Sequence, residues 1–161
     1  MINKVIAAMI EYYSGDPKRI QHFIKVYTFA HSIAQGEGMG GKELYTLDIA
    51  ALVHDIGIKI SEEKYNSCAG KYQEMEGPKE AEKLLSRLGV EKDVIDRVCY
   101  LVGHHHTYNN ITSPDYQILV EADFLVNLYE DNESRDAAAS VRDKIFKTKT
   151  GTRYINDMFA I

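Results

Sequence analysis

Cysteine is scarce in this sequence, and its scarcity bears on the compartment in which the protein folds. The 161 residues include only Cys68 and Cys99, which form neither a Cys-x-x-Cys pair nor a disulfide framework. Disulfide frameworks are typical of small secreted domains, whereas cytoplasmic proteins keep their thiols reduced. We therefore expect a cytoplasmic protein.

Long apolar runs are also lacking. The first ten residues are largely apolar, but Glu11-Tyr12-Tyr13 follows at once. A bilayer-spanning helix needs about 20 apolar residues, and a secretory signal peptide ends in small residues at its cleavage site. The N-terminal segment is therefore predicted to be an amphipathic helix, and no membrane partner is expected.

An excess of positive charge is missing as well. The formal net charge is −5 at pH 7, with six histidines counted as neutral. Binders of nucleic acid polymers or anionic membranes usually present a basic face, so the charge argues against both classes. The negative net charge is compatible with a small phosphorylated substrate that is held by a few local cations. The glycine-rich segment 36–41 lacks the Lys-Ser/Thr ending of a phosphate-binding P-loop and is predicted to be an ordinary loop.

Strand-type alternation is hard to find, and helical periodicity dominates instead. Hydrophobic residues make up 45% and charged residues 27% of the chain, which fits an ordinary folded domain. We predict one all-α domain over residues 1–161, with its core at about 17–130 and C-terminal helices at 131–161. The helices are predicted at about residues 2–13, 17–35, 42–54, 78–88, 92–105, 115–129 and 134–146.

Three segments next to these helices carry specific predictions. Asp16-Pro17 suits a helix start, with Asp16 as N-cap and Pro17 at the first helical position. Residues 58–72 are polar and are predicted to form a long loop with a short helical turn, before Pro78 opens the next helix. Residues 148–153 are predicted to be loop-like and to lead into a short helical tail.

One apolar helix face carries a histidine inward. In the second predicted helix, Val26, Ala30 and Ile33 recur at three- or four-residue spacing, and His22 lies on the same stripe. His31 follows His22 by nine residues, which places it on the opposite side of the helix. His22 is therefore the candidate ligand, and His31 is interpreted as a surface or packing histidine.

The third predicted helix ends in a His-Asp doublet. His54 shares a face with Ala50 and Ala51, and Asp55 projects one step further round, just before the helix breaks at Gly57. Burying a charged carboxylate is costly unless it is paired, hydrogen-bonded or bound to a metal. The doublet therefore needs partners elsewhere in the chain.

Two later helices carry further candidates. His105 continues the apolar line of the helix before it, whereas His104 and His106 flank that line. A run of histidines can equally be a solvated helix end, and this alternative stays open for His104 and His106. Asp123 lies on an apolar face in mid-helix without an Arg or Lys three or four residues away, so its partner must be distant in sequence.

Four helices thus each place one or two polar residues on an inward face, namely His22, His54, Asp55, His105 and Asp123. If several of them converge, they form a site of imidazole and carboxylate ligands. This donor set suits a borderline divalent metal, Mn, Fe, Co, Ni or Zn, and suits Ca less well. The sequence therefore predicts a metal centre.

The ordered set resembles the HD-domain superfamily of metal-dependent phosphohydrolases. His22 sits in a His-x3-Val-x3-Ala context. The doublet lies in Ala-Leu-Val-His54-Asp55-Ile-Gly, and the last aspartate lies in Glu-Ala-Asp123-Phe-Leu. The resemblance covers about residues 17–130 and rests on the order and flanks of these motifs rather than on the doublet alone.

For fold and chemistry, the resemblance implies an all-α bundle that binds one divalent metal. Its ligands would be His22, His54, Asp55 and Asp123. The reaction would be hydrolysis of a phosphomonoester or phosphodiester in a small molecule, with a nucleotide as the expected substrate. The metal would lower the pKa of a water molecule and polarise the phosphoryl oxygen, while Asp55 orients or deprotonates that water.

A second metal site is left open. Some branches of the family bind another ion through later histidines, with the doublet aspartate bridging, and His104 and His105 resemble those histidines. The mid-chain histidine of such branches is absent at Glu76-Gly77-Pro78, where Glu76 could substitute as an oxygen ligand or simply cap the helix. If they are not ligands, His104 or His105 would protonate the leaving oxygen or hold a phosphate oxygen.

Substrate contacts are assigned to cations and polar side chains close to these motifs. The candidates are Arg19, Lys71, Tyr72, Gln73 and Glu76. For any single lysine the default interpretation is a solvated surface charge.

Two other functions are kept as alternatives. A mixed-valent di-iron oxygenase occurs in some HD-fold branches and would show two irons per chain with oxygen-dependent turnover. A non-catalytic nucleotide- or metal-binding module would show tight ligand binding without turnover. A homodimer is also left open.

Overall fold

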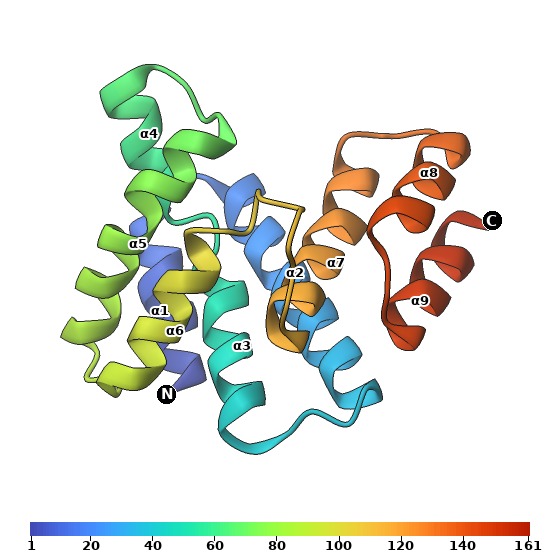
Figure 1. Cartoon of the computed structure of the whole chain (residues 1–161). Coiled ribbons are helices and arrows are strands. Elements are labelled where there is room, and N and C mark those ends of the chain that lie inside the picture. The colour runs from blue at the N-terminus through green and yellow to red at the C-terminus, as the bar shows by residue number, and fades with distance from the viewer.

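The chain folds into nine α-helices without a strand, as the computed structural model of residues 1–161 shows (Figure 1). None of these helices is long and apolar enough to cross a lipid bilayer. The all-α prediction is confirmed. In chain order the helices are α1 (Ile2–Tyr12), α2 (Pro17–Gly36), α3 (Gly41–Val53), α4 (Gly57–Tyr65), α5 (Gly70–Arg87), α6 (Lys92–Val102), α7 (Pro114–Glu130), α8 (Arg135–Ile145) and α9 (Lys149–Phe159).

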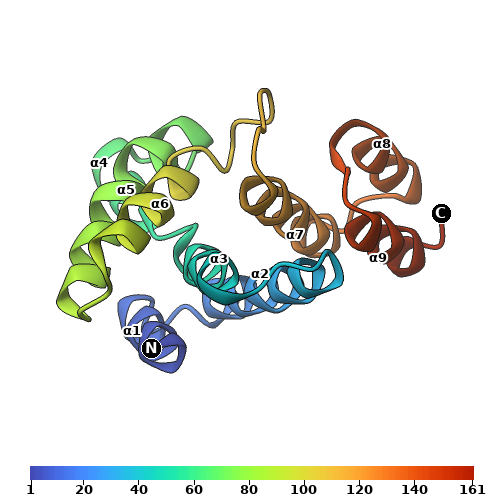
Figure 2. The same ribbon diagram turned by 60° about the horizontal axis from the view of Figure 1, so that its bottom comes forward.

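The helices α2, α3 and α7 form the centre of the bundle, where α2 packs against both of the others. On one side α5 packs between α4 and α6, and on the far side of α7 lie α8 and α9 (Figures 1 and 2). The core contains 36 buried residues and extends from Val5 in α1 to Ile155 in α9. Because α3 is buried along its whole C-terminal half, its last residues lie deep in the molecule.

The start of α2 follows the predicted capping pattern. The Asp16 side chain accepts a hydrogen bond from the Arg19 backbone N–H at 3.0 Å, and Pro17 is the first helical residue. The cap satisfies one of the free N–H groups at the helix N-terminus, and proline has no N–H to leave unpaired there.

The prediction for residues 58–72 is wrong, because this segment is mostly helical. α4 occupies Gly57–Tyr65, α5 begins at Gly70, and Pro78 lies inside α5 rather than at its start. Gln73, Gly77 and Ala81 are buried at four-residue spacing on both sides of the proline. Packing of this face against neighbouring helices outweighs the backbone hydrogen bond that proline cannot make.

The prediction of a loop at 148–153 is also wrong, because α9 begins at Lys149. The reason is Glu121, a fully buried carboxylate on α7. Its Oε1 accepts the backbone N–H groups of Lys147 at 2.7 Å and Thr148 at 3.0 Å, and its Oε2 accepts the Thr148 hydroxyl at 2.5 Å. The Thr148 hydroxyl oxygen in turn accepts the Gly151 N–H and caps the helix.

The helices α4 and α5 approach closely at Gly57, directly after the His-Asp doublet. A Cβ atom at Gly57 would lie 2.8 Å from both the Gln73 carbonyl oxygen and the Gly77 backbone nitrogen. These are backbone atoms of α5, so the helices must move apart to admit a methyl group.

We expect Gly57→Ala to lower the free energy of unfolding by about 1–3 kcal/mol, the usual cost of overpacking. Urea denaturation measures the change. Gly40→Ala is the control, since a Cβ at Gly40 meets nothing within 4 Å and the only expected loss is that of an N-cap glycine, below about 1 kcal/mol. Equal stability of the two variants would contradict the close approach.

Candidate metal centre and its cavity

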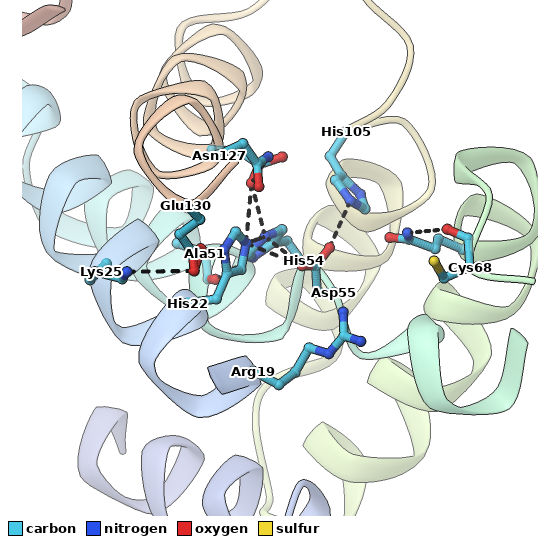
Figure 3. A network of polar contacts seen from close by, with 12 residues as sticks. Arg19, His22, Lys25, Ala51, His54, Asp55, Cys68, His105, Asn127 and Glu130 are labelled. Carbon is cyan, nitrogen blue, oxygen red and sulfur yellow. Dashed lines mark hydrogen bonds and ion pairs between the residues drawn. The ribbon is translucent and has the colours of Figure 1, made fainter. Parts of the chain in front are cut away.

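Two imidazoles and two carboxylates from three helices meet in the middle of the bundle (Figure 3). His22 lies on α2 and Asp123 on α7, while His54 and Asp55 follow the last residue of α3. All four are buried. His22 Nε2 is 3.2 Å from His54 Nε2, 3.2 Å from Asp55 Oδ2 and 3.3 Å from Asp123 Oδ1. His54 Nε2 is 3.4 Å from Asp55 Oδ2 and 3.5 Å from Asp123 Oδ1.

These spacings fit the coordination shell of a metal ion. Nitrogen and oxygen ligands lie about 2.0–2.2 Å from a zinc-like ion, so neighbouring ligand atoms are about 3.0–3.5 Å apart. All of the distances above, from 3.2 to 3.5 Å, fall in that window. The ligand atoms of His22, His54 and Asp123 all lie within 4.8 Å of one another, and Asp55 Oδ2 lies within 3.4 Å of both imidazoles, so the four donors surround one point that suits a divalent ion.

The orientation of the two imidazoles supports the same fit. His22 Nδ1 donates to the Glu130 carboxylate, and His54 Nδ1 donates to the Ala51 carbonyl oxygen at 2.7 Å. Neutral rings held in this way direct their Nε2 lone pairs at each other, at Asp55 Oδ2 and at Asp123 Oδ1. Two imidazole nitrogens and two carboxylate oxygens that face one another are all acceptors. A positively charged partner, either a metal ion or a proton, is needed to satisfy them.

Protons are the competitors of the metal in this cluster. Burial alone lowers the pKa of His22, but hydrogen bonds with Asp123 and Asp55 outweigh it and raise that pKa to about 10. The pKa of Asp123 is lowered although burial opposes this, because its carboxylate is bonded to His22 and His54. Near neutral pH, the metal-free cluster is therefore expected to hold at least one imidazolium.

Metal binding at pH 8 is expected to release about one proton or more per ion, because His22 with a pKa of about 10 is protonated there and must lose its proton to coordinate. Calorimetric titration of the metal-free protein with Mn²⁺ in buffers of different ionisation enthalpy measures this release. Below a pH of about 10 His22 is protonated and adds to the proton release on metal binding, whereas above that pH it has no proton to release. A binding enthalpy that does not depend on the buffer at pH 8 would contradict the protonated cluster.

A second cluster shares Asp55 with the first. His105 is fully buried, and its Nδ1 donates to the Val102 carbonyl oxygen at 2.8 Å. Its Nε2 has no hydrogen-bond donor and lies 3.3 Å from Asp55 Oδ1. His106 completes the group, and its ligand atom lies within 4.8 Å of those of Asp55 and His105. Asp55 thus directs one oxygen to each cluster, which is the arrangement of a bridging carboxylate.

The tautomer of His106 is fixed by a hydrogen-bond chain. Gln73 Nε2 donates to the Cys68 carbonyl oxygen at 2.6 Å, so the Gln73 Oε1 atom is the one that faces His106 Nε2, at 2.9 Å. His106 Nε2 must therefore carry the proton, and Nδ1 is left with a lone pair. Burial and the neighbouring His105 lower the pKa of His106 to about 4, which keeps the ring neutral near pH 7.

A cavity of about 300 Å³ opens beside both clusters. Arg19 extends toward the region between Asp55 and Cys68 (Figure 3). Its guanidinium makes no hydrogen bond within the chain, and its nearest carboxylate, on Glu62, is 3.5 Å away. The cavity is lined by Asp16, Lys18, Arg19, His22, Asp55, Ile58, Cys68, Gln73, His106, Asp123, Asn127, Glu130 and Asp131.

The comparisons with known proteins agree with this geometry. A family model described as "HD domain" matches residues 19–147. The chain belongs to the HD-domain family. Its structure is similar to a crystal structure of a predicted HD superfamily hydrolase from an uncultured Thermotogales bacterium, with 26% identity, a TM-score of 0.71, and coverage of 98% of this chain and 84% of that one. None of the curated proteins compared with the chain is detectably similar in sequence.

The resemblance inferred from sequence is therefore confirmed, and this HD domain belongs to a superfamily of hydrolases that bind divalent metals. Of the substrate contacts predicted from sequence, the structure brings Arg19 and Gln73 to the cavity.

The other three predicted substrate contacts of the HD domain lie away from the cavity. Lys71 Nζ sits 4.8 Å from the centre of the Tyr72 ring, which stacks on Tyr65. The Glu76 carboxylate accepts from the Tyr65 hydroxyl at 2.9 Å and from Lys64 at 3.1 Å. With its oxygens engaged there, Glu76 is not a ligand of the second cluster.

His104 is also placed differently from the prediction. Its Nδ1 donates to the Tyr100 carbonyl oxygen at 2.6 Å, and its ring stacks on the Tyr100 ring. The reason is that α6 ends at Val102, so helical periodicity does not extend through the histidine run. His106, rather than His104, joins His105 in the second cluster of the HD domain, and it also lines the cavity.

Sequence reasoning missed two cavity residues on α7. Asn127 Nδ2 donates to Asp123 Oδ1 at 2.9 Å, and Glu130 accepts from His22. Both follow Asp123 at helical spacing, four and seven residues later, so a search for polar residues on the Asp123 face would have found them.

Proposed function

We propose that this HD domain hydrolyses a small phosphate ester with the help of a divalent metal, Mn, Fe, Co, Ni or Zn. The observation that carries the proposal is the convergence of four acceptor atoms beside a cavity that holds the Arg19 guanidinium, which makes no hydrogen bond within the chain and only long ion pairs with Asp16 and Glu62. A metal bound by His22, His54, Asp55 and Asp123 would lower the pKa of a water molecule and polarise a phosphoryl oxygen. The remaining steps belong to side chains of the chain itself.

Asp55 is proposed to orient the attacking water and to accept its proton. Its two oxygens face the two clusters, so the carboxylate is fixed on both sides. Arg19 holds the non-reacting phosphate oxygens, because its five donors have no hydrogen-bond partner within the chain. The water oxygen bonds to phosphorus as the ester P–O bond breaks, and the alcohol leaves with a proton.

Neither His104 nor His105, the two proton donors expected from sequence, lines the cavity, so the leaving oxygen is proposed to take its proton from a water molecule there. His106 lines the cavity, and Gln73 fixes its ring. The bare Nε2 of His105 next to Asp55 also supports a second ion, held by Asp55, His105 and His106. Metal content per chain decides between one and two ions.

The second cluster also bears on the redox alternative. A di-iron oxygenase needs two adjacent metal sites, and the Asp55, His105 and His106 group provides the donors for another one. Oxygen consumption by the iron-loaded protein would favour this function over hydrolysis.

The test of hydrolysis is phosphate release by the metal-loaded protein from p-nitrophenyl phosphate, bis-p-nitrophenyl phosphate and a panel of natural esters. We expect release that is abolished by a chelator and restored by Mn²⁺, Co²⁺ or Zn²⁺. The diester separates phosphodiesterase from phosphomonoesterase activity. No metal-dependent release from any ester would overturn the proposal.

A further inference from the structure

The lining of the cavity bears on the class of substrate. Only two of its 13 residues are hydrophobic, Ile58 and Cys68, and none is a phenylalanine, tyrosine or tryptophan. Proteins usually hold nucleobases by stacking them on aromatic rings or between apolar side chains. The only aromatic rings in the lining are the imidazoles of His22 and His106, which belong to the two clusters, so the walls offer no free platform for the base of the nucleotide expected from sequence.

The walls instead present hydrogen-bond acceptors. Asn127 uses its NH₂ group on Asp123, so its Oδ1 atom is left to accept. The Asp131 carboxylate has no partner within the chain, and the Asp16 oxygen that does not cap α2 makes only a long ion pair with Arg19, at 3.8 Å. Hydroxyl and ammonium groups are the donors that such acceptors bind.

The charge of the cavity limits the number of phosphoryl groups that the substrate can carry. Its lining has five carboxylates and only two cationic side chains, Lys18 and Arg19. With a divalent ion, the site keeps one net negative charge. Three of the carboxylates, on Asp16, Glu130 and Asp131, are not among the four proposed metal ligands. A single phosphoryl group is held by the ion and Arg19, whereas a second one would face carboxylates.

We infer that the substrate is a monoester with one phosphoryl group on a small, non-aromatic alcohol that carries further hydroxyl or ammonium groups. The inference rests on the proposed hydrolase function and specifies its substrate class. Water attack on phosphorus yields inorganic phosphate and the free alcohol, whose hydroxyl receives the proton.

The experiment compares kcat/KM of the Mn²⁺-loaded protein for matched monoesters. The hydroxyl arm uses glycerophosphate and a hexose monophosphate, the ammonium arm uses phosphoethanolamine, and the nucleotide arm uses adenosine monophosphate. The matching hexose bisphosphate and adenosine diphosphate test the second phosphoryl group. We expect one of the first two arms to exceed the nucleotide arm, and each singly phosphorylated compound to exceed its doubly phosphorylated partner by about tenfold.

A charge-reversal variant tests separately whether the cavity carboxylates disfavour a second phosphoryl group. Asp131→Lys adds two units of charge at the cavity, on an exposed side chain without partners. It is expected to lower the monophosphate-to-bisphosphate ratio of kcat/KM by about tenfold. Asp157→Lys is the control, because it makes the same change in net charge on an exposed part of α9 outside the cavity lining and should leave the ratio unchanged.

Each outcome has a defined meaning. A nucleotide or a bisphosphate hydrolysed with the highest kcat/KM would overturn this inference and leave the proposed function standing. Equal ratios for Asp131→Lys and Asp157→Lys would refute the part assigned to charge. If no ester is hydrolysed, the proposed function fails and this inference fails with it.

Discussion

Replacing Asp55 by asparagine is expected to remove both metal binding and phosphate release. The amide keeps the shape of the side chain but loses the charge that lies 3.2 Å from His22 and 3.3 Å from His105. Because the same substitution removes a ligand and the group that handles the water proton, we expect kcat to fall at least about a thousandfold. Metal content by mass spectrometry and kcat on p-nitrophenyl phosphate measure the two effects.

The helix α3, which ends just before the doublet, offers a matched control. Asp48 is buried on α3 and pairs with His31 Nδ1 at 2.9 Å, outside both clusters. Asp48→Asn therefore makes the same chemical change to a buried carboxylate–imidazole pair, and it should leave metal content unchanged. If Asp55→Asn retains wild-type metal and kcat, Asp55 has neither role.

Removing the Glu130 side chain is expected to weaken metal binding about 10- to 100-fold, the usual effect of losing the partner that orients a ligating histidine. Glu130 accepts the Nδ1 proton of His22 and lies 3.5 Å from Lys25. Without that acceptor, the His22 ring is free to turn, and its Nε2 is less basic. Competition titration with a fluorescent chelator measures the dissociation constants.

Two further variants separate orientation from a general effect of charge. Glu130→Gln keeps an oxygen that can accept the His22 proton, so it should recover part of the affinity lost in Glu130→Ala. Glu133→Ala removes an exposed carboxylate just beyond α7 and should bind metal as the wild type does. Equal affinities for Glu130→Ala and Glu133→Ala would refute the role assigned to Glu130.

The sequence was sufficient to predict the all-α fold and to identify four side chains that the structure brings to one point. Strict helical spacing makes this possible, because His22 shares the stripe of Val26 and Ala30, and both are fully buried. The doublet could be placed in the same way, since the residues before it in α3 are buried without interruption. Local periodicity therefore carries most of the information about the first cluster.

The parts that could not be predicted depend on tertiary contacts. Glu121 organises the start of α9 from a position 27 residues earlier in the chain, and no local pattern shows that bond. α5 continues through Pro78 because its buried face is packed on both sides of the proline. The direction of each histidine after α6 depends on where that helix ends, so His104 and His106 could not be told apart from spacing alone.

The measurement that tests the metal centre most directly is the metal content and turnover of purified wild-type protein beside His54→Ala. His54 is fully buried and directs Nε2 at His22, Asp55 and Asp123, so it has no contact with solvent that could compensate for its loss. We predict at least one divalent transition metal per wild-type chain, and loss of both the metal and metal-dependent phosphate release in the variant. A His54→Ala protein that is folded, keeps its full metal content and retains wild-type activity would contradict the account.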